Sequence, residues 1–193
     1  MRPVLQVGVI AMVAVLGSCG GEKADGSAAA GSDAGIVRVP TSGGTATTIH
    51  LVVGGGPHAG TYDAKSNDIT CTYGFAGPGS WGNQYSVTGK KPNEFSSLQL
   101  IVPNTKDAAD GTDKFLITAG FGQLMQPGYT EHTINTGAAL FGGNTEDVKK
   151  EGSGTITVDD RGKSGKVTFK GKTKDNVSLE GTIDCHQVMR GES

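Results

Sequence analysis

Residues 155–185 alternate apolar and polar side chains in three successive runs, and this pattern constrains the fold more than any other part of the chain. The runs cover 155–159, 166–170 and 177–185, and the residues that join them are rich in Asp, Gly, Lys and Asn. Alternation with a period of two places one face of a strand on a core, and turn residues at short spacing join antiparallel neighbours. The segment therefore predicts an antiparallel meander.

Similar β signals precede this segment. Five further runs are expected to form strands, at 47–53, 67–75, 81–87, 95–102 and 114–121. No part of this region has a convincing helical period, although residues 144–151 could form a single helical turn. Roughly eight to ten strands with one polar face each favour an all-β fold, an antiparallel β-sandwich, with a β-barrel as the alternative.

Residues 1–19 have a different character. Arg2 supplies a positive charge, and residues 4–16 form an apolar run without a charged side chain. This run is shorter than the roughly 20 residues that a membrane-spanning helix needs. The pattern is typical of a secretory signal peptide.

Residues 20–35 contain no large apolar side chain. Such a segment cannot bury enough surface to order itself, so we expect a flexible Gly/Ala/Ser linker. The predicted organisation is a signal peptide at 1–18, a cysteine with a linker at 19–44 and a single β-rich domain at 45–193.

The four residues Leu16-Gly17-Ser18-Cys19 resemble the lipobox of bacterial lipoproteins, whose cysteine is acylated and becomes the mature N-terminus. The order of signal, cysteine, linker and domain is similar to that of small surface lipoproteins such as the mycobacterial 19-kilodalton antigen family. The resemblance implies a palmitate-bearing lipid on Cys19 and attachment to the bacterial cell envelope. Gly20, where an Asp would favour retention in the inner membrane, favours the outer membrane if the organism has one. An ordinary cleaved signal peptide with an incidental Cys19 is the alternative.

The chain has three cysteines. If Cys19 carries the lipid, Cys71 and Cys185 remain, and two leftover cysteines in an exported protein usually pair in the oxidising compartment. Both lie on the apolar side of their expected strands, which favours a disulfide over two free buried thiols. Two cysteines with the adjacent His186 do not form a zinc site.

Charge and motifs restrict the partners and the chemistry. The net charge of −2 becomes more negative by one when Arg2 is removed with the signal, so nothing predicts a nucleic-acid partner. The membrane contact is expected through the lipid, the other partner is an unspecified protein or glycan, and no cofactor is expected.

No catalytic residues are predicted. Residues 77–82 lack the Gly-x-Ser-x-Gly spacing around Ser80. The four histidines, His50, His58, His132 and His186, are scattered along the chain. We therefore expect a non-catalytic binding or structural role, with an envelope hydrolase as a less favoured alternative that requires convergent titratable residues.

Two weaker candidates for a site remain. Asp107, Asp110 and Asp113 surround Gly111 and could supply oxygen ligands to Ca²⁺, but their spacing differs from an EF-hand loop and equally suits a plain strand connection.

Four aromatic residues, Trp81, Tyr85, Tyr62 and Tyr129, lie in or beside glycine-rich turns. Flat apolar rings flanked by polar groups suit sugars, so a carbohydrate- or ligand-binding module is the alternative function. It predicts that Trp81 and at least one tyrosine line an exposed groove. A Trp81 side chain buried in the core would remove its main support.

Overall fold

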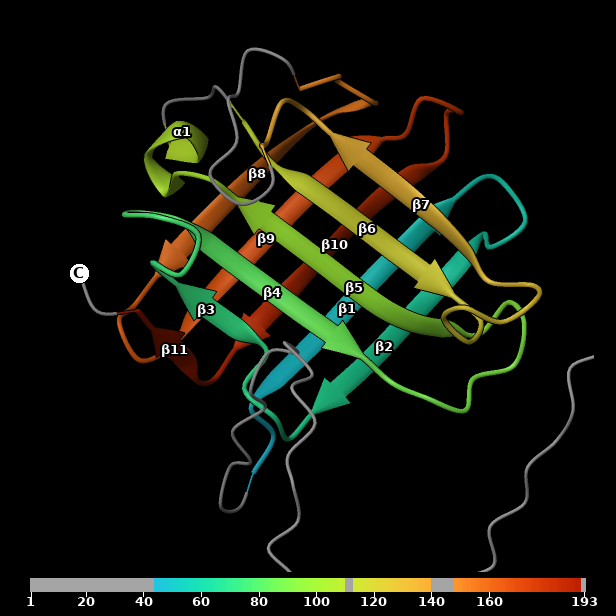
Figure 1. Cartoon of the computed structure of the whole chain (residues 1–193), viewed down its shortest axis with the longest axis horizontal. Coiled ribbons are helices and arrows are strands. Elements are labelled where there is room, and N and C mark those ends of the chain that lie inside the picture. Colours follow the sequence, from blue (N-terminus) through green and yellow to red (C-terminus); the bar gives the residue numbers. More distant parts are fainter. Residues whose placement is uncertain (1–43, 110–112, 140–147, 192–193) are drawn as a thin grey trace, which may run out of the picture. The chain divides into compact units, whose positions relative to one another are not determined.

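The computed structural model describes residues 44–109, 113–139 and 148–191, which all belong to one compact unit, Val37–Ser193. These residues form 11 strands and one short helix, arranged as two sheets packed face to face (Figure 1). The all-β sandwich expected from the sequence is thereby confirmed. The predicted signal peptide, Cys19 and most of the predicted linker lie outside the described residues.

The first sheet has five strands in the order β2-β1-β10-β9-β8, and every neighbouring pair is antiparallel. Its strands are β1 (Thr47–Gly54), β2 (Gly60–Ser66), β8 (Ser153–Asp160), β9 (Gly165–Lys172) and β10 (Ser178–Cys185). The expected meander is confirmed as β8-β9-β10, and β10 continues the sheet by pairing with β1, with Thr47 opposite Cys185. One end of this sheet therefore carries the β8–β9 turn, and the opposite end carries the β1–β2 loop and the β9–β10 turn.

The second sheet has six strands in the order β11-β3-β4-β5-β6-β7. Its strands are β3 (Cys71–Tyr73), β4 (Trp81–Ser86), β5 (Phe95–Val102), β6 (Leu116–Phe121), β7 (Thr130–Asn135) and β11 (Val188–Arg190). The pairing of β11 with β3 is parallel, whereas the other pairs of this sheet are antiparallel. The chain reaches β11 directly from β10 and thus ends in the opposite sheet.

The core lies between the sheets, whose strands run across one another rather than along one another (Figure 1). Alternation decides which side chains are buried. On β5, Leu98, Leu100 and Val102 are completely buried, and on β10, Leu179 and Ile183 are. Removal of such side chains from water is the main stabilising contribution, at about 1.5–3 kcal/mol for each.

Glycines inside the five-stranded sheet make room for aromatic rings of the other sheet. A Cβ atom on Gly165 would lie 2.4 Å from Cη2 of Trp81, and one on Gly154 would lie 3.2 Å from Cζ of Phe115. These rings therefore pack directly against the backbone of β9 and β8. Glycines therefore occur not only in turns and the linker but also inside this sheet, where they let bulky and small residues interlock in the core.

Several elements were not expected from the sequence. Strands β2, β7 and β11 carry few buried apolar side chains, and the expected strand at 67–75 is reduced to Cys71–Tyr73, with Phe75 exposed. The short helix α1 (Thr105–Ala109) lies beside β8. Of the suggested helical turn at 144–151, the first half lies outside the described residues, and residues 148–151 are not helical. The described part of the chain contains no apolar helix of the length that a bilayer requires.

Candidate functional site

Cys71 and Cys185 form a disulfide, as the sequence predicts, and their Cα atoms are 6.1 Å apart. The bond joins β3 of the six-stranded sheet to the last residue of β10 in the five-stranded sheet. Both residues are buried. A covalent bond therefore closes the sandwich at this end of the five-stranded sheet, which we term the cystine end.

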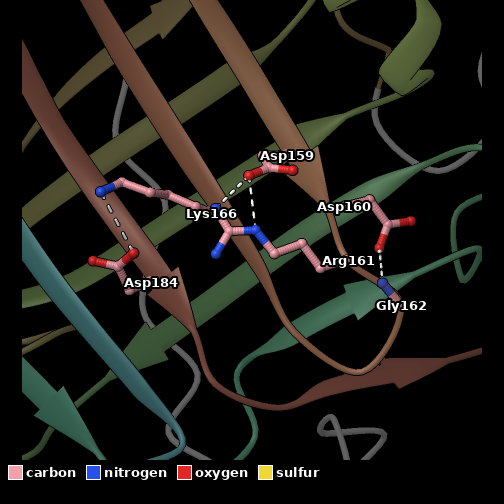
Figure 2. A network of polar contacts seen from close by, with 6 residues as sticks. All are labelled: Asp159, Asp160, Arg161, Gly162, Lys166 and Asp184. Atoms are coloured by element: carbon pink, nitrogen blue, oxygen red, sulfur yellow. Dashed lines mark hydrogen bonds and ion pairs between the residues drawn. The ribbon is translucent and has the colours of Figure 1, made fainter.

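Polar contacts lie next to the cystine end, and Figure 2 shows those among Asp159, Asp160, Arg161, Gly162, Lys166 and Asp184. At the β8–β9 turn, Arg161 pairs with Asp159, and the amide of Gly162 donates to Asp160. Arg190 of β11 also pairs with Asp160, donates through Nε to the carbonyl of Gly162, and lies over the Tyr73 ring at 4.5 Å. These contacts attach the C-terminal strand to the turn of the opposite sheet, and they indicate a structural role.

His58 occupies the opposite end of the five-stranded sheet, in the loop between β1 and β2. Only 2% of its surface is exposed. Its ring is stacked on Phe121 with centroids 4.2 Å apart, and its Nδ1 lies 3.0 Å from Nε2 of His132. Its Nε2 lies 3.1 Å from both Asn93 Oδ1 and Thr130 Oγ1. We term these residues, with His58 at the centre, the histidine end.

These contacts determine where the ring hydrogens lie. Asn93 Oδ1 can only accept a hydrogen bond, so Nε2 of His58 carries a hydrogen. In the neutral ring, Nδ1 of His58 is then an acceptor, and Nε2 of His132 donates to it. Nδ1 of His132 is left without a hydrogen bond to any described residue, and it is the nitrogen of the pair that can take up a proton without breaking the contact.

The surroundings of His132 oppose its charged form. Burial lowers the pKa of His132 below its usual 6.5, the neighbouring His58 lowers it further, and the carboxylate of Asp175 partly offsets these effects. The imidazole is therefore neutral over a wider pH range than that of an exposed histidine.

A polar pocket of about 280 Å³ lies beside His132. Its lining residues are Glu131, His132, Thr133, Glu151, Thr173, Lys174 and Asp175. They come from β7, from the residues before β8 and from the β9–β10 turn, so both sheets contribute. Carboxylates, an ammonium, hydroxyls and an imidazole offer hydrogen bonds to a small polar ligand. Among these described lining residues there is no serine or cysteine to act as a nucleophile.

The structure does not form the aromatic groove expected from the sequence. Trp81 is 1% exposed and packs on Gly165, while Tyr85 is 6% exposed and stacks on Phe95. Both point inward because β4 alternates buried and accessible residues from Trp81 onward. The expectation that Trp81 anchors an exposed sugar site is therefore wrong.

The two remaining tyrosines do not replace this groove. Tyr62 is half-buried between the rings of Phe95 and Phe121, and its hydroxyl donates to the carbonyl of His58. Tyr129 is half-buried and donates to Glu131. Tyr62 therefore supports the histidine end.

The candidate Ca²⁺ residues are only partly described. Oδ1 of Asp113 accepts from the amide of Ile156 on β8, and its backbone amide donates to the carbonyl of Asp107. Asp110 lies outside the described residues. Within the described ranges, no three His, Cys, Asp or Glu side chains gather as metal ligands do. The contacts of Asp113 indicate a strand connection.

The histidine end was not predicted as a site because His58 and His132 are 74 positions apart. The only sequence signal is the presence of a histidine in the glycine-rich segment 54–60, where an exposed turn is expected. By contrast, His50 and His186 are exposed, as expected for isolated histidines, and His50 pairs with Asp63.

Comparisons with known proteins do not assign the chain to a group. No family model, no curated protein and no solved structure matches it.

Proposed function

We propose that this chain is an exported lipoprotein of the bacterial cell envelope, anchored through a lipid on Cys19, with a β-sandwich that serves a non-catalytic binding or structural role. The observation that carries the proposal is the buried Cys71–Cys185 disulfide. Such bonds are typical of proteins exported to oxidising compartments. Of the three cysteines, only Cys19 is then left for acylation, within the lipobox-like segment.

Labelling and fractionation test the anchor. After growth with radiolabelled palmitate, the native protein should carry label and sediment with membranes, whereas Cys19→Ser should carry none and be released. The matched control is the double variant Cys71→Ala/Cys185→Ala, which should keep the label because these cysteines are not acylated. Label on Cys19→Ser, or a native protein without label, would refute lipidation.

The second candidate function is small-ligand binding at the pocket beside His132. It is favoured by the gathering of hydrogen-bonding side chains from both sheets. The lining also brings His132 together with the carboxylates of Glu131, Glu151 and Asp175, which are the convergent titratable residues that an envelope hydrolase requires, so hydrolysis at this pocket is the alternative to binding.

Chemical-shift mapping by NMR with glucose and glucosamine tests this second candidate. Binding should shift the signals of Thr133 and Thr173, and Glu151→Gln should weaken it. Glu180→Gln, on the exposed face of β10, is the matched control. Shifts spread over residues outside the pocket, or none at millimolar concentrations of either sugar, would contradict this site for sugars.

A further inference from the structure

We propose that the His58–His132 pair is a pH-sensitive connection between the two sheets, and that protonation of both imidazoles releases the loops that His58 holds together. The inference depends on the geometry of the histidine end and is independent of the lipid anchor.

His58 belongs to the five-stranded sheet, in the β1–β2 loop, but each of its side-chain hydrogen bonds to a described residue goes to the other sheet. Asn93 lies in the β4–β5 loop, and Thr130 and His132 lie on β7. One buried imidazole therefore connects a loop of the five-stranded sheet to two segments of the six-stranded sheet.

The pair can hold only a limited number of protons without losing its contact. One hydrogen lies between Nδ1 of His58 and Nε2 of His132, which are 3.0 Å apart. A proton added to Nδ1 of His132 leaves this bond intact. A second proton can only go to Nδ1 of His58, where it places two N–H groups and two positive charges against each other. The contact cannot survive in that state.

Charged and titratable side chains lie on the elements around the pair. The titratable and charged groups on the surrounding elements are Tyr62, Lys90, Lys91, Glu94, Tyr129, Glu131, Glu151, Lys174 and Asp175. Asp175 favours a first proton on His132, while burial and the second imidazole oppose it. Among the described residues, no carboxylate makes a hydrogen bond to His58, whose ring partners there are Asn93, Thr130 and His132. A carboxylate therefore lies near the site of the first proton, whereas the described ring contacts of His58, the site of the second, include none.

The β4–β5 and β6–β7 loops lie beside the pair. The amide of Gly122 donates to the carbonyl of Glu94, next to Asn93, so the β4–β5 and β6–β7 loops are joined beside the pair. The β6–β7 loop presents Leu124 and Met125, which are 57% and 92% exposed. Acid should therefore loosen a discrete group of loops at the histidine end, including one with an apolar tip, while the cystine end stays closed.

Amide hydrogen exchange on the folded protein tests this proposal over a series from about pH 7.5 down to about pH 4, because burial and the neighbouring His58 hold the pKa of His132 below the ordinary histidine value. The protection factors of Gly122 and Val87, whose amides make hydrogen bonds within this loop group, should fall about tenfold in acid, as expected for the loss of one buried hydrogen bond. Those of Val188 and Gly191, at the cystine end, should not change.

His132→Gln is the informative variant. The Gln amide does not titrate, and it can donate to Nδ1 of His58 or accept from it, so the fall at Gly122 should largely disappear. His50→Gln, which changes an exposed histidine, is the matched control and should behave like the native protein. An equal fall in His132→Gln and the native protein, or no fall in the native protein, would overturn the proposal.

A second measurement uses the native protein alone and holds even if the variant fails to fold. The ring signals of His132, followed by NMR, should change in a first step as the pH is lowered, and the loop signals should change only in a later step. Loop signals that change together with the first step, or that do not change at all, would overturn the proposal.

Discussion

At one end of the five-stranded sheet, Cys185 is bonded covalently to Cys71 of the opposite sheet, and at the other end His58 reaches that sheet through hydrogen bonds alone. The disulfide and the His58 ring are buried, whereas the groups that the His58 ring contacts are half-buried or exposed, and both connections join segments far apart in the chain. They respond to different conditions, because a disulfide is broken by reduction and an imidazole pair by protons. The two ends of one sandwich are thus sensitive to separate chemical variables.

The two connections also stabilise the fold in different ways. In the chain-entropy model, the disulfide acts mainly on the unfolded chain, where it closes a loop across a sequence separation of 114. The histidine contacts exist only in the folded protein, so they stabilise it locally. We therefore expect the cystine end to determine global stability and the histidine end to determine local opening.

Among the changes that test this comparison, removal of the disulfide should lower the stability of the fold most. Cys71→Ala/Cys185→Ala should lower the free energy of unfolding by about 4–5 kcal/mol, from the length of the loop. Urea unfolding at neutral pH measures this change, and reductant should reproduce it in the native protein. A loss no larger than that of a histidine-end variant would break the comparison.

Gly165→Ala should show how much side-chain packing, as distinct from the disulfide, stabilises the cystine end. The added Cβ would lie 2.4 Å from the Trp81 ring and 3.1 Å from the carbonyl of Asp159, so the sheets must move apart. Overpacking of this kind costs about 1–3 kcal/mol. The control is Gly60→Ala on β2, where the nearest atom is 3.5 Å away. Equal unfolding midpoints for both variants would contradict the role given to Gly165.

His58→Phe should separate the apolar and polar parts of the histidine end. The new ring can still stack on Phe121, but Asn93, Thr130 and His132 lose their partner, at a cost of about 1–2 kcal/mol near neutral pH.

The same variant should reduce the pH dependence of stability. The pKa of His132 is lowered in the folded protein, so the unfolded chain binds more protons below pH 6.5 and native stability falls as the pH falls through that window. Without His58, one of the causes of this lowering is gone. Urea midpoints from neutral pH to about pH 5 measure the slope, with His186→Gln as the exposed control. A steeper slope in His58→Phe would contradict this account.

Arg190→Gln should have the smallest effect, because the disulfide still holds the start of the C-terminal segment. The variant loses the ion pair with Asp160 and the contact with the Tyr73 ring, both of which are at the surface, so the expected loss is up to about 1 kcal/mol. The control is Arg161→Gln, whose exposed pair with Asp159 should not affect the unfolding midpoint. Unfolding of Arg190→Gln as severe as that of the disulfide variant would show that the ion pair is the main closure.

Local patterns predicted the strands in which one face is clearly apolar, such as β5 and β10, because burial follows alternation directly. They failed for β2 and β7. Both are edge strands; β2 has no buried residue, and in β7 only Ile134 is buried. Such strands form because a neighbour supplies hydrogen-bond partners, and no local pattern records that neighbour.

The site was less predictable than the fold. The Cys71–Cys185 pair was predicted because two cysteines remain when Cys19 is assigned to the lipid, and because both lie on the apolar faces of their strands, which share one core. Trp81 was misjudged because its glycine-rich neighbours in sequence indicate a turn, whereas the space that it fills is provided by Gly165 on a distant strand.

The sequence by itself determined the β class of the fold, the meander and the pairing of two cysteines, because each depends on residues that are close in the chain or on simple counting. Only the tertiary structure decided that β11 joins the opposite sheet, that Trp81 is buried, and that His58 meets His132. These outcomes depend on packing between segments tens of residues apart, where the shape and hydrogen bonding of one segment determine what the other can do.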